Sequence, residues 1–259
     1  GNLSRDYSYL QDLYEILLQD LSGQLNEIHN VNHSVRYWRI LIGPWLGYFI
    51  QMLFDRWSML NKAVKEYDID ACQVLNRNVK SIVPNDMTDF VRLFDNDDWN
   101  EAIYGQLLIG HLKHNMVVTS VNTKSACQSS VSMEIEPLSE KLKRFFKIFT
   151  TKISGVLTRE NDYFFISSYF SLSTLFALQF RLRQFPSFWS AIQMDYCNVD
   201  LRRRQWQLTT PESLDDFPII VRKLIPKHIP IAYLEGYKEL IEFTEKLPWP
   251  RKPKAIFTS

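Results

Sequence analysis

The tryptophan-rich segment at residues 29–57, HNVNHSVRYWRILIGPWLGYFIQMLFDRW, constrains the fold more than any other part of the chain. Within residues 40–54, Gln51 is the only strongly polar side chain. A membrane-spanning helix needs about 20 apolar residues, and shorter apolar runs more often form core helices. We therefore expect a buried helix here rather than a membrane span.

The pair Gly43-Pro44 interrupts this segment. Proline is accepted in the first turn of a helix, but in the interior it removes a backbone hydrogen bond and clashes. Residues 34–67 are therefore predicted to form either two abutting helices or one kinked helix. Upstream, apolar residues spaced three and four apart predict an amphipathic helix over residues 5–28.

The remainder of the chain alternates between helical and extended patterns. Asp98, with Glu101 three residues later, has capping-box spacing, and Thr210 before Pro211 is a second helix start. Helices are predicted at 98–114, 137–153, 171–185, 210–225 and 231–246, and strands at 67–75, 116–121, 162–169 and 254–259. This alternation predicts a helix-rich α/β fold with a large helical addition at the front.

The predicted organisation has three parts: a mainly helical part at 1–118, a polar loop or insertion at 119–136, and an α/β part at 137–259. The chain starts without methionine and stops where an apolar strand has just begun. A parallel strand normally leads on to a further crossover. We therefore expect this chain to be one piece of a longer protein.

Composition excludes several classes of function. A net charge of +1 argues against nucleic acid as the main partner, because phosphate backbones require a concentrated basic face. Three separated cysteines with no C-x-x-C spacing indicate a reducing compartment. The sequence has no P-loop, dinucleotide fingerprint or G-x-S-x-G elbow, so we predict no cofactor and no serine nucleophile.

Two pairs of histidines are candidate ligands of a metal ion. His29 and His33 are four residues apart, as two zinc ligands on one helical face would be. The intervening NVN favours a turn, however, and the glutamate of an H-E-x-x-H motif is missing. His111 and His114 have no carboxylate or thiol pattern nearby. We predict no metal.

Arg36 and Arg39 lie three residues apart at the start of a predicted helix, just after His33. Guanidinium groups and free backbone N–H groups at a helix start hold phosphate or carboxylate well. The alternative is that both arginines form ion pairs with nearby acids. The sequence leaves both interpretations open.

The stretch FISSYFS places hydroxyl groups after a predicted buried strand. Ligands of open α/β sheets bind at the carboxyl ends of the strands, so Ser167, Ser168 and Tyr169 are candidate binding residues. Helix capping by Ser168 or Ser171 is the alternative. The basic run DLRRRQWQL at 200–208 is suited either to contact with a phosphate or sugar, or to a solvated face.

Four stretches together carry a resemblance: the segment from IHNVNH to FDRW, then DDWNEAIYGQLL, then FFISSYFS with LRQFPSFW, and finally KAIFTS. In this order they resemble landmarks of a transferase family encoded in bacterial surface-polysaccharide and O-antigen gene clusters. The resemblance implies the N-terminal, acceptor-side half of a glycosyltransferase with Rossmann-like, GT-B-type lobes. It also implies a nucleotide-sugar donor, a glycan acceptor, and a cytoplasmic location at the inner face of the membrane.

The resemblance implies site residues as well. The matching positions are His33, Arg36, Arg39, Ser167, Ser168, Tyr169 and Gln184. The catalytic base is not identified, and Asp55 is a candidate only through its proximity in sequence. Most donor contacts would lie in the half that this chain lacks, so the piece alone is expected to be inactive.

Two other functions compete with this prediction. A non-catalytic helical module that binds another protein, or the missing half, would present a large exposed apolar patch. Peripheral membrane contact through the tryptophan-rich helix is the third option.

Overall fold

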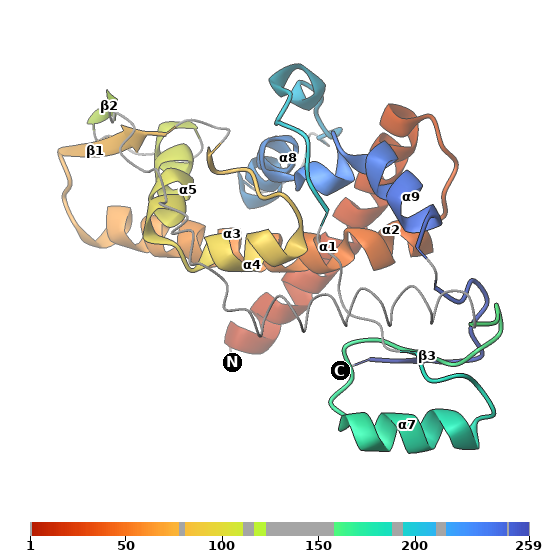
Figure 1. Cartoon of the computed structure of the whole chain (residues 1–259). Helices are drawn as coiled ribbons and strands as arrows, with labels where there is room; N and C mark the ends of the chain where they lie inside the picture. Colours follow the sequence, from red (N-terminus) through yellow and green to blue (C-terminus); the bar gives the residue numbers. More distant parts are fainter. Residues whose placement is uncertain are drawn as a thin grey trace, which may run out of the picture. The chain divides into compact units, whose positions relative to one another are not determined.

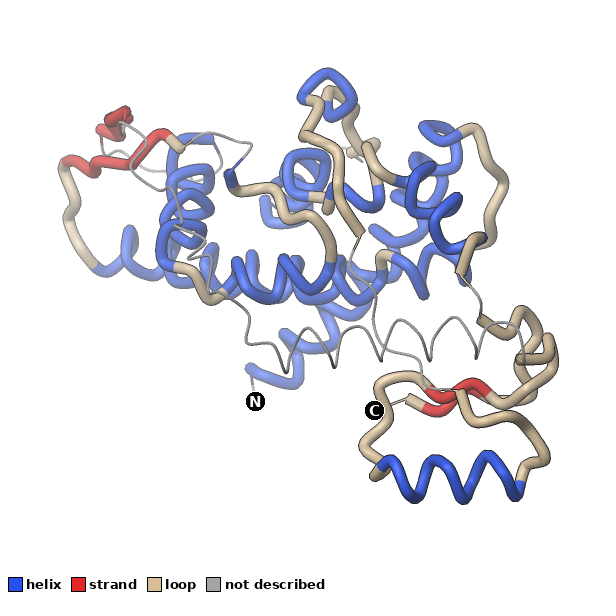
Figure 2. Tube along the Cα trace, viewed as in Figure 1, coloured by secondary structure: helices blue, strands red, loops and turns tan. Residues whose placement is uncertain are grey.

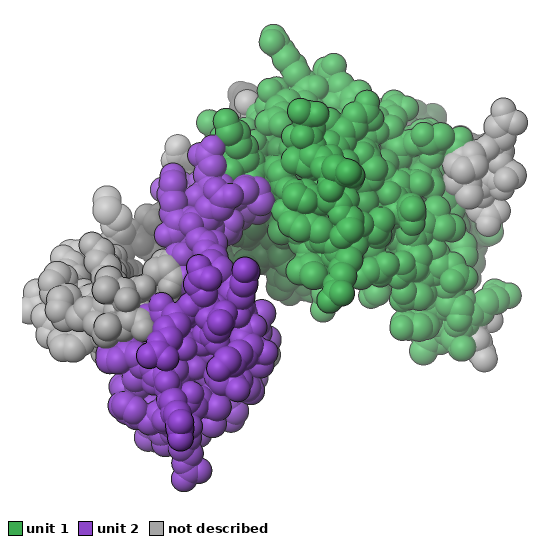
Figure 3. Space-filling model, turned by 90° about the vertical axis from the view of Figure 1, so that its right-hand side faces the viewer, with its two compact units in different colours: residues 1–127, 196–239 green, residues 128–195, 240–259 purple. Residues whose placement is uncertain are grey.

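The computed structural model describes residues 2–77, 81–110, 117–122, 158–187, 194–210, 216–247 and 249–258. The chain divides into two compact units (Figure 3). Unit 1 comprises Gly1–Cys127 and Tyr196–Glu239, and unit 2 comprises Gln128–Asp195 and Leu240–Ser259. The predicted division around the polar loop at 119–136 stays a prediction, because most of that loop lies outside the described residues.

Unit 1 begins with the helices α1 (Asn2–His29), α2 (Val35–Leu41) and α3 (Gly43–Glu66) (Figure 1). They confirm the predicted amphipathic helix and, of the two alternatives for residues 34–67, the pair of abutting helices, with Pro44 in the first turn of α3. Trp38 and Trp45 have no exposed surface, so one face of the tryptophan-rich segment is interior, whereas Ile40 and Tyr48 are exposed. Among the described helices, none combines the length and apolarity that crossing a bilayer requires.

One end of unit 1 contains a small parallel sheet. Strand β1 (Ala71–Asn76) pairs with β2 (Val117–Asn122), with Ala71 opposite Val117. Helix α5 (Asp97–Gly110) packs on β1 and against α3, and α4 (Met87–Phe94) precedes it (Figure 1). The approach of α5 to β1 is close at Gly105, where an added Cβ would lie 3.4 Å from Cβ of Val74.

The predicted capping box of α5 is wrong. Asn96 caps this helix, because its Oδ1 accepts a hydrogen bond from the Trp99 backbone N–H at 3.0 Å. Asp98 and Glu101 instead accept hydrogen bonds from Nη2 of Arg77, at 2.6 and 2.8 Å. The predicted continuation of the helix to residue 114 lies outside the described residues.

The second stretch of unit 1, Tyr196–Glu239, completes its core. Helix α8 (Asp216–His228) packs against α3, where Phe217 lies 5.2 Å from both Phe54 and Trp57, measured between ring centroids. It continues past the predicted end at residue 225, with Pro226 in its last turn. The predicted cap at Thr210 stays a prediction, since residues 211–215 lie outside the described part.

The single helix predicted at residues 231–246 is wrong. The chain forms a short 3-10 helix η3 (Ile231–Tyr233), turns, and then forms α9 (Tyr237–Glu245). The turn is closed by the Gly236 backbone N–H, which donates to the Ile231 carbonyl at 2.8 Å. A local pattern of apolar residues continues across this turn, so periodicity alone does not reveal it.

Unit 2 contains β3 (Phe164–Phe165), α7 (Leu172–Arg181) and β4 (Ile256–Phe257), and the two strands pair in parallel. Strand β3 is shorter than the strand predicted at 162–169, and two residues after its end the chain turns at Ser167, which has a φ of 48°. The described residues are mainly helical, with two small parallel sheets (Figure 2). A larger Rossmann-like sheet and the predicted helix at 137–153 stay predictions.

Candidate functional site

The corner between α1 and α2 is fixed by Asn26. Its Oδ1 accepts hydrogen bonds from the His33 backbone N–H at 3.0 Å and from Trp38 Nε1 at 2.9 Å. Its Nδ2 donates to the His33 carbonyl at 2.9 Å, and Ser34 caps α2 through the Tyr37 backbone N–H. One amide side chain thus sets the direction in which α2 and its arginines leave α1.

The two histidines of this corner pack against tyrosine rings. His33 stacks on Tyr37 with centroids 3.9 Å apart, and His29 stacks on Tyr237 at 4.1 Å. His29 Nε2 lies 3.1 Å from the Tyr233 carbonyl, and burial lowers the pKa of its ring. No metal-ligand cluster of three or more His, Cys, Asp or Glu residues occurs in the described part of the chain. His111 and His114 lie outside the described residues.

Arg39 forms a two-pronged ion pair with Glu15 of α1. Its Nη1 and Nη2 lie 2.6 and 2.5 Å from the two carboxylate oxygens, and this hydrogen bonding raises the pKa of Arg39. Arg36 is exposed, and it has no ion-pair partner among the described residues. Ion pairing therefore accounts for Arg39, whereas an anion-binding role for Arg36 stays a prediction.

A groove of about 960 Å³ lies between α1 and α3 and includes Arg39 in its lining. Tyr14 lies against the α3 backbone at Gly43, where an added Cβ would be 2.6 Å from the Tyr14 hydroxyl oxygen. The guanidinium of Arg39 sits 5.8 Å from the centroid of the same tyrosine ring. The small glycine thus makes room for an aromatic side wall.

The groove combines aromatic rings, carboxylates and amides with aliphatic side chains such as Leu10 and Ile50. The side chains that give it this character are Asp6, Tyr7, Gln11, Tyr48, Gln51 and Asp55. Tyr7 and Tyr48 are well exposed, so a ligand can reach the faces of their rings. Asp55 lies 3.6 Å from Arg56 yet stays 66% exposed. Such a lining suits a neutral polyhydroxy ligand, which offers apolar C–H faces and many hydroxyl donors.

The predicted hydroxyl residues belong to unit 2. Ser167 and Tyr169 are exposed, Ser168 is half-buried, and the cap of α7 is Ser171, whose Oγ accepts from the Thr174 backbone N–H. Since the arginines belong to unit 1, a cleft shared by the serines and the arginines stays a prediction.

Gln184 is a buried structural residue of unit 2. Its Oε1 accepts from the Tyr163 backbone N–H at 2.8 Å, and its Nε2 donates to the Tyr163 carbonyl at 2.9 Å. The same Nε2 donates to Gln179 Oε1 at 3.1 Å. With both ends of its amide engaged, Gln184 holds the chain before β3 in place, and contact with a substrate stays a prediction.

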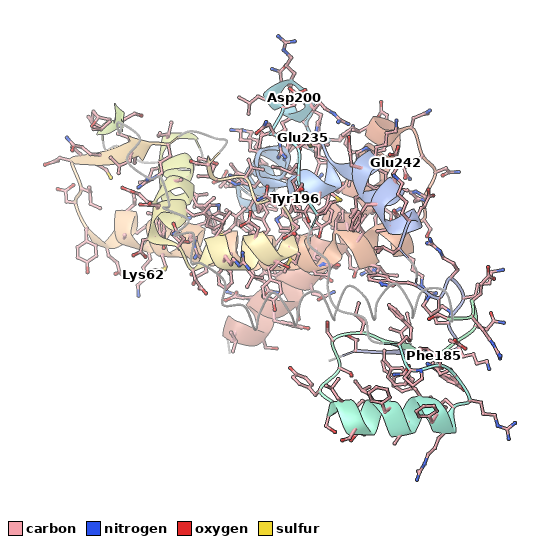
Figure 4. The ribbon with its side chains drawn as sticks, in the orientation of Figure 1. Lys62, Phe185, Tyr196, Asp200, Glu235 and Glu242 are labelled. Atoms are coloured by element: carbon pink, nitrogen blue, oxygen red, sulfur yellow. The ribbon has the colours of Figure 1, made fainter. Side chains whose placement is uncertain are left out.

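A buried ion pair is the main feature that the sequence did not reveal. Arg204, at the end of the 3-10 helix η2 (Leu201–Arg204), donates to both carboxylate oxygens of Glu235 at 2.6 Å. Both side chains are 3% exposed, whereas Arg202 and Arg203 are on the surface. Figure 4 labels Glu235 together with Asp200, whose backbone N–H donates to the same carboxylate.

The chain matches, over residues 1–259, the model of a family described as the LIC12162 family transferase. It therefore belongs to this family of transferases. The comparisons with curated proteins and with solved structures give no match.

Proposed function

We propose that this chain is the acceptor-side portion of a glycosyltransferase. It would move a sugar from a nucleotide-activated donor to a growing surface polysaccharide or O-antigen. Membership of a transferase family supports the transfer reaction, and the groove between α1 and α3 supports the sugar. The observation that carries the proposal is the combination of exposed tyrosine rings with carboxylates and amides in one groove.

In the proposed reaction, an acceptor sugar stacks on Tyr7 or Tyr48 and directs a hydroxyl group toward a carboxylate. Asp55 accepts the proton from this hydroxyl while its oxygen attacks the anomeric carbon of the donor. The bond between that carbon and the nucleotide phosphate breaks, and cationic groups stabilise the leaving phosphate. Arg36 is the candidate cation of this chain.

The remaining parts of the proposal extend beyond the groove. A Rossmann-like, GT-B-type architecture would place most donor contacts in a second lobe. The reaction would occur in the cytoplasm, and the proposal requires neither a metal nor a cofactor. Ser167, Ser168 and Tyr169 would face the donor side.

The test uses the full-length protein with a panel of nucleotide sugars. Calorimetry identifies the donor, and turnover is then compared for Asp55→Asn and for the matched control Asp12→Asn, an exposed α1 carboxylate away from the groove. Loss of a general base lowers kcat by roughly 10²–10⁴-fold, while donor binding and the control remain unchanged. The absence of heat with every donor would contradict the proposal.

A non-catalytic interaction module is the second candidate. It is favoured by the exposed apolar residues of α7. A module of this kind gives no heat with any nucleotide sugar, so the same calorimetry separates the two functions.

A further inference from the structure

Unit 1 contains a cavity that the proposed transfer reaction does not use. It has a volume of about 360 Å³ and is lined by the end of β1, by α5, by η2 and by the last turn of α8. We call it the basic pocket, after the polar part of its lining, which consists of Arg77, Gln106, Arg204 and Lys227. It shares no residue with the groove between α1 and α3. Its volume falls within the range of sites for small molecules.

The basic pocket lies at the carboxyl end of a parallel strand. Leu75 is the penultimate residue of β1, and Arg77 directly follows the strand. Helix α5 packs on β1 (Figure 1), and Gly105 permits a close approach to Val74 one residue before Gln106. Open α/β folds bind their ligands outside the carboxyl ends of the strands, so this position is typical of a binding site.

Every charged side chain in the described lining of the pocket is a cation. These are Arg77, Arg204 and Lys227. Both arginines form ion pairs, with carboxylates that do not line the pocket. Lys227 is exposed and has no ion-pair partner among the described residues. A ligand in the pocket therefore meets one cation whose charge is not yet neutralised.

The buried ring of His228 is influenced by the same positive charge. Its Nε2 donates to Gln106 Oε1 at 2.8 Å, and the residue is 1% exposed. Burial is the main cause of the low pKa of His228, and the next largest causes are the positive charges of Arg204 and Lys227. Positive charge thus dominates the field beside Gln106, although Arg204 is ion-paired.

The polar groups still available in the lining are hydrogen-bond donors. An amide oxygen can only accept, so the contact with His228 leaves the two N–H groups of Gln106 Nε2 without a partner among the described residues. Arg77 uses Nη2 for both of its ion pairs, while its Nε is buried and has no hydrogen-bond partner. Lys227 adds an ammonium group with three donors. The matching ligand group is an anion with several acceptor oxygens, such as a phosphate.

The rest of the lining favours an organic ligand over a bare ion. Leu75, Ile82, Ile109 and Leu201 contribute aliphatic side chains. An inorganic ion leaves this apolar surface in water, whereas the ring of a nucleoside or a sugar covers it, and burial of apolar surface stabilises the complex.

We propose that the basic pocket binds a small phosphate-bearing organic molecule. Its phosphate accepts hydrogen bonds from Lys227, from Gln106 Nε2 and from the free N–H groups of Arg77, and its organic part covers the aliphatic side chains. Nucleotides and sugar phosphates share this chemistry. The site does not depend on the proposed glycosyl transfer, because none of its residues belongs to the groove.

The test is calorimetry of the unaltered chain with four probes: inorganic phosphate, uridine, uridine monophosphate and glucose 1-phosphate. We expect inorganic phosphate to bind weakly and uridine not to bind. At least one of the two phosphate esters should bind more tightly than inorganic phosphate, and the tighter ester identifies the organic part. A higher salt concentration should weaken the binding, because it screens the charges.

Two variants locate the binding. Lys227→Gln should raise the dissociation constant of the tighter ester by roughly tenfold or more, since it removes a charged hydrogen bond. The matched control is Lys223→Gln, one helical turn earlier, which alters an exposed lysine of α8 outside the pocket and should change nothing. Gln106→Glu keeps an acceptor for His228 but replaces the amide donors by a carboxylate, so it should abolish binding of the ester.

Four outcomes would overturn the proposal. None of the three phosphate-bearing probes produces heat, or Lys227→Gln and Lys223→Gln bind the tighter ester equally well. Binding of uridine as tight as that of uridine monophosphate would show that the phosphate is not recognised. Binding of inorganic phosphate as tight as that of both esters would show that the pocket holds only an ion.

Discussion

At the scale of single residues, the buried pair of Arg204 and Glu235 couples three segments of unit 1. Arg204 also donates to the carbonyls of Pro226 at 3.1 Å and Ile229 at 2.8 Å. The guanidinium therefore links η2 by hydrogen bonds both to the end of α8 and to the turn before α9. Removing two ions from water is costly, and only such complete hydrogen bonding offsets the cost.

Glu235→Gln should destabilise the protein strongly. The substitution leaves a buried guanidinium without a counter-charge, and breaking a buried pair in this way costs about 3–5 kcal/mol. Urea denaturation measures the change in the free energy of unfolding. Arg202→Gln, on the exposed side of η2, is the control and should cost less than about 0.5 kcal/mol. Equal stability of the two variants would show that the pair contributes nothing.

His228 predicts a pH dependence of stability. Its Nε2 lies 2.8 Å from Gln106 Oε1, and burial lowers the pKa of the ring from 6.5 to about 3. Between these values the unfolded chain binds a proton and the folded chain does not. Stability should therefore fall as the pH drops through this window, by about 1.4 kcal/mol per pH unit.

The measurement is a set of denaturation curves for the unaltered chain and for His228→Gln, which keeps a hydrogen-bond donor for Gln106. The curves span the range from the ordinary histidine pKa of 6.5 to about two pH units below it. The variant should show a flatter slope. His29, whose pKa is also lowered by burial, contributes a slope of the same sign that remains in both proteins. Identical slopes would mean that His228 takes up its proton while the protein is folded.

At the scale of elements, the packing of α1 against α3 depends on the positions of the glycines in α3. Gly43 and Gly47 both face Tyr14, but only the first is in tight contact with it. The sequence predicted α1 and the break at Gly43-Pro44, because apolar spacing and proline act locally. It did not predict α4, although Asp86 caps that helix through the Asp89 backbone N–H at 2.8 Å.

Gly43→Ala should push Tyr14 from its position and narrow the groove. The new Cβ would be 2.6 Å from the tyrosine hydroxyl oxygen, whereas at Gly47 it would be 3.7 Å from the ring, an ordinary contact. We expect Gly43→Ala to be about 1–2 kcal/mol less stable than Gly47→Ala, since overpacking costs about this much. Chemical denaturation of both variants gives the difference. Equal stabilities would show that Tyr14 moves aside without cost.

At the scale of the whole molecule, unit 1 is assembled from two separated stretches of chain. Its second stretch supplies α8, which packs on α3 through Phe217 and places Arg222 2.6 Å from Asp20 of α1. The helices of the first stretch therefore bury one of their faces only when the second stretch packs against them.

A chain cut after Asp195 should lose cooperative unfolding, because the faces of α1 and α3 that contact α8 would meet water. A chain cut after Lys246 is the control, since it keeps all of unit 1 and loses only part of unit 2. Hydrogen exchange of α1 and α3 reports the difference. Unchanged protection in the shorter chain would show that the first stretch folds alone.

Prediction of the site was less complete than prediction of the helices. Arg39 and Asp55 were candidates from sequence and do line the groove, whereas Asp6 and Tyr7 gave no signal. Which side chains line the groove depends on how α1 and α3 pack against each other, and the local spacing of residues does not encode this packing. Gln184 was a site candidate, yet the structure engages its amide with the backbone of Tyr163.

The sequence by itself determined the long helices at the front of the chain, the break at Pro44, and that the tryptophan-rich segment is too short for a membrane span. These properties depend on neighbours a few residues apart, through backbone geometry and apolar spacing. Only the tertiary structure decided that Arg204 meets Glu235 and that Tyr14 lies against Gly43. Each of these depends on segments brought together by packing, so no local pattern can specify it.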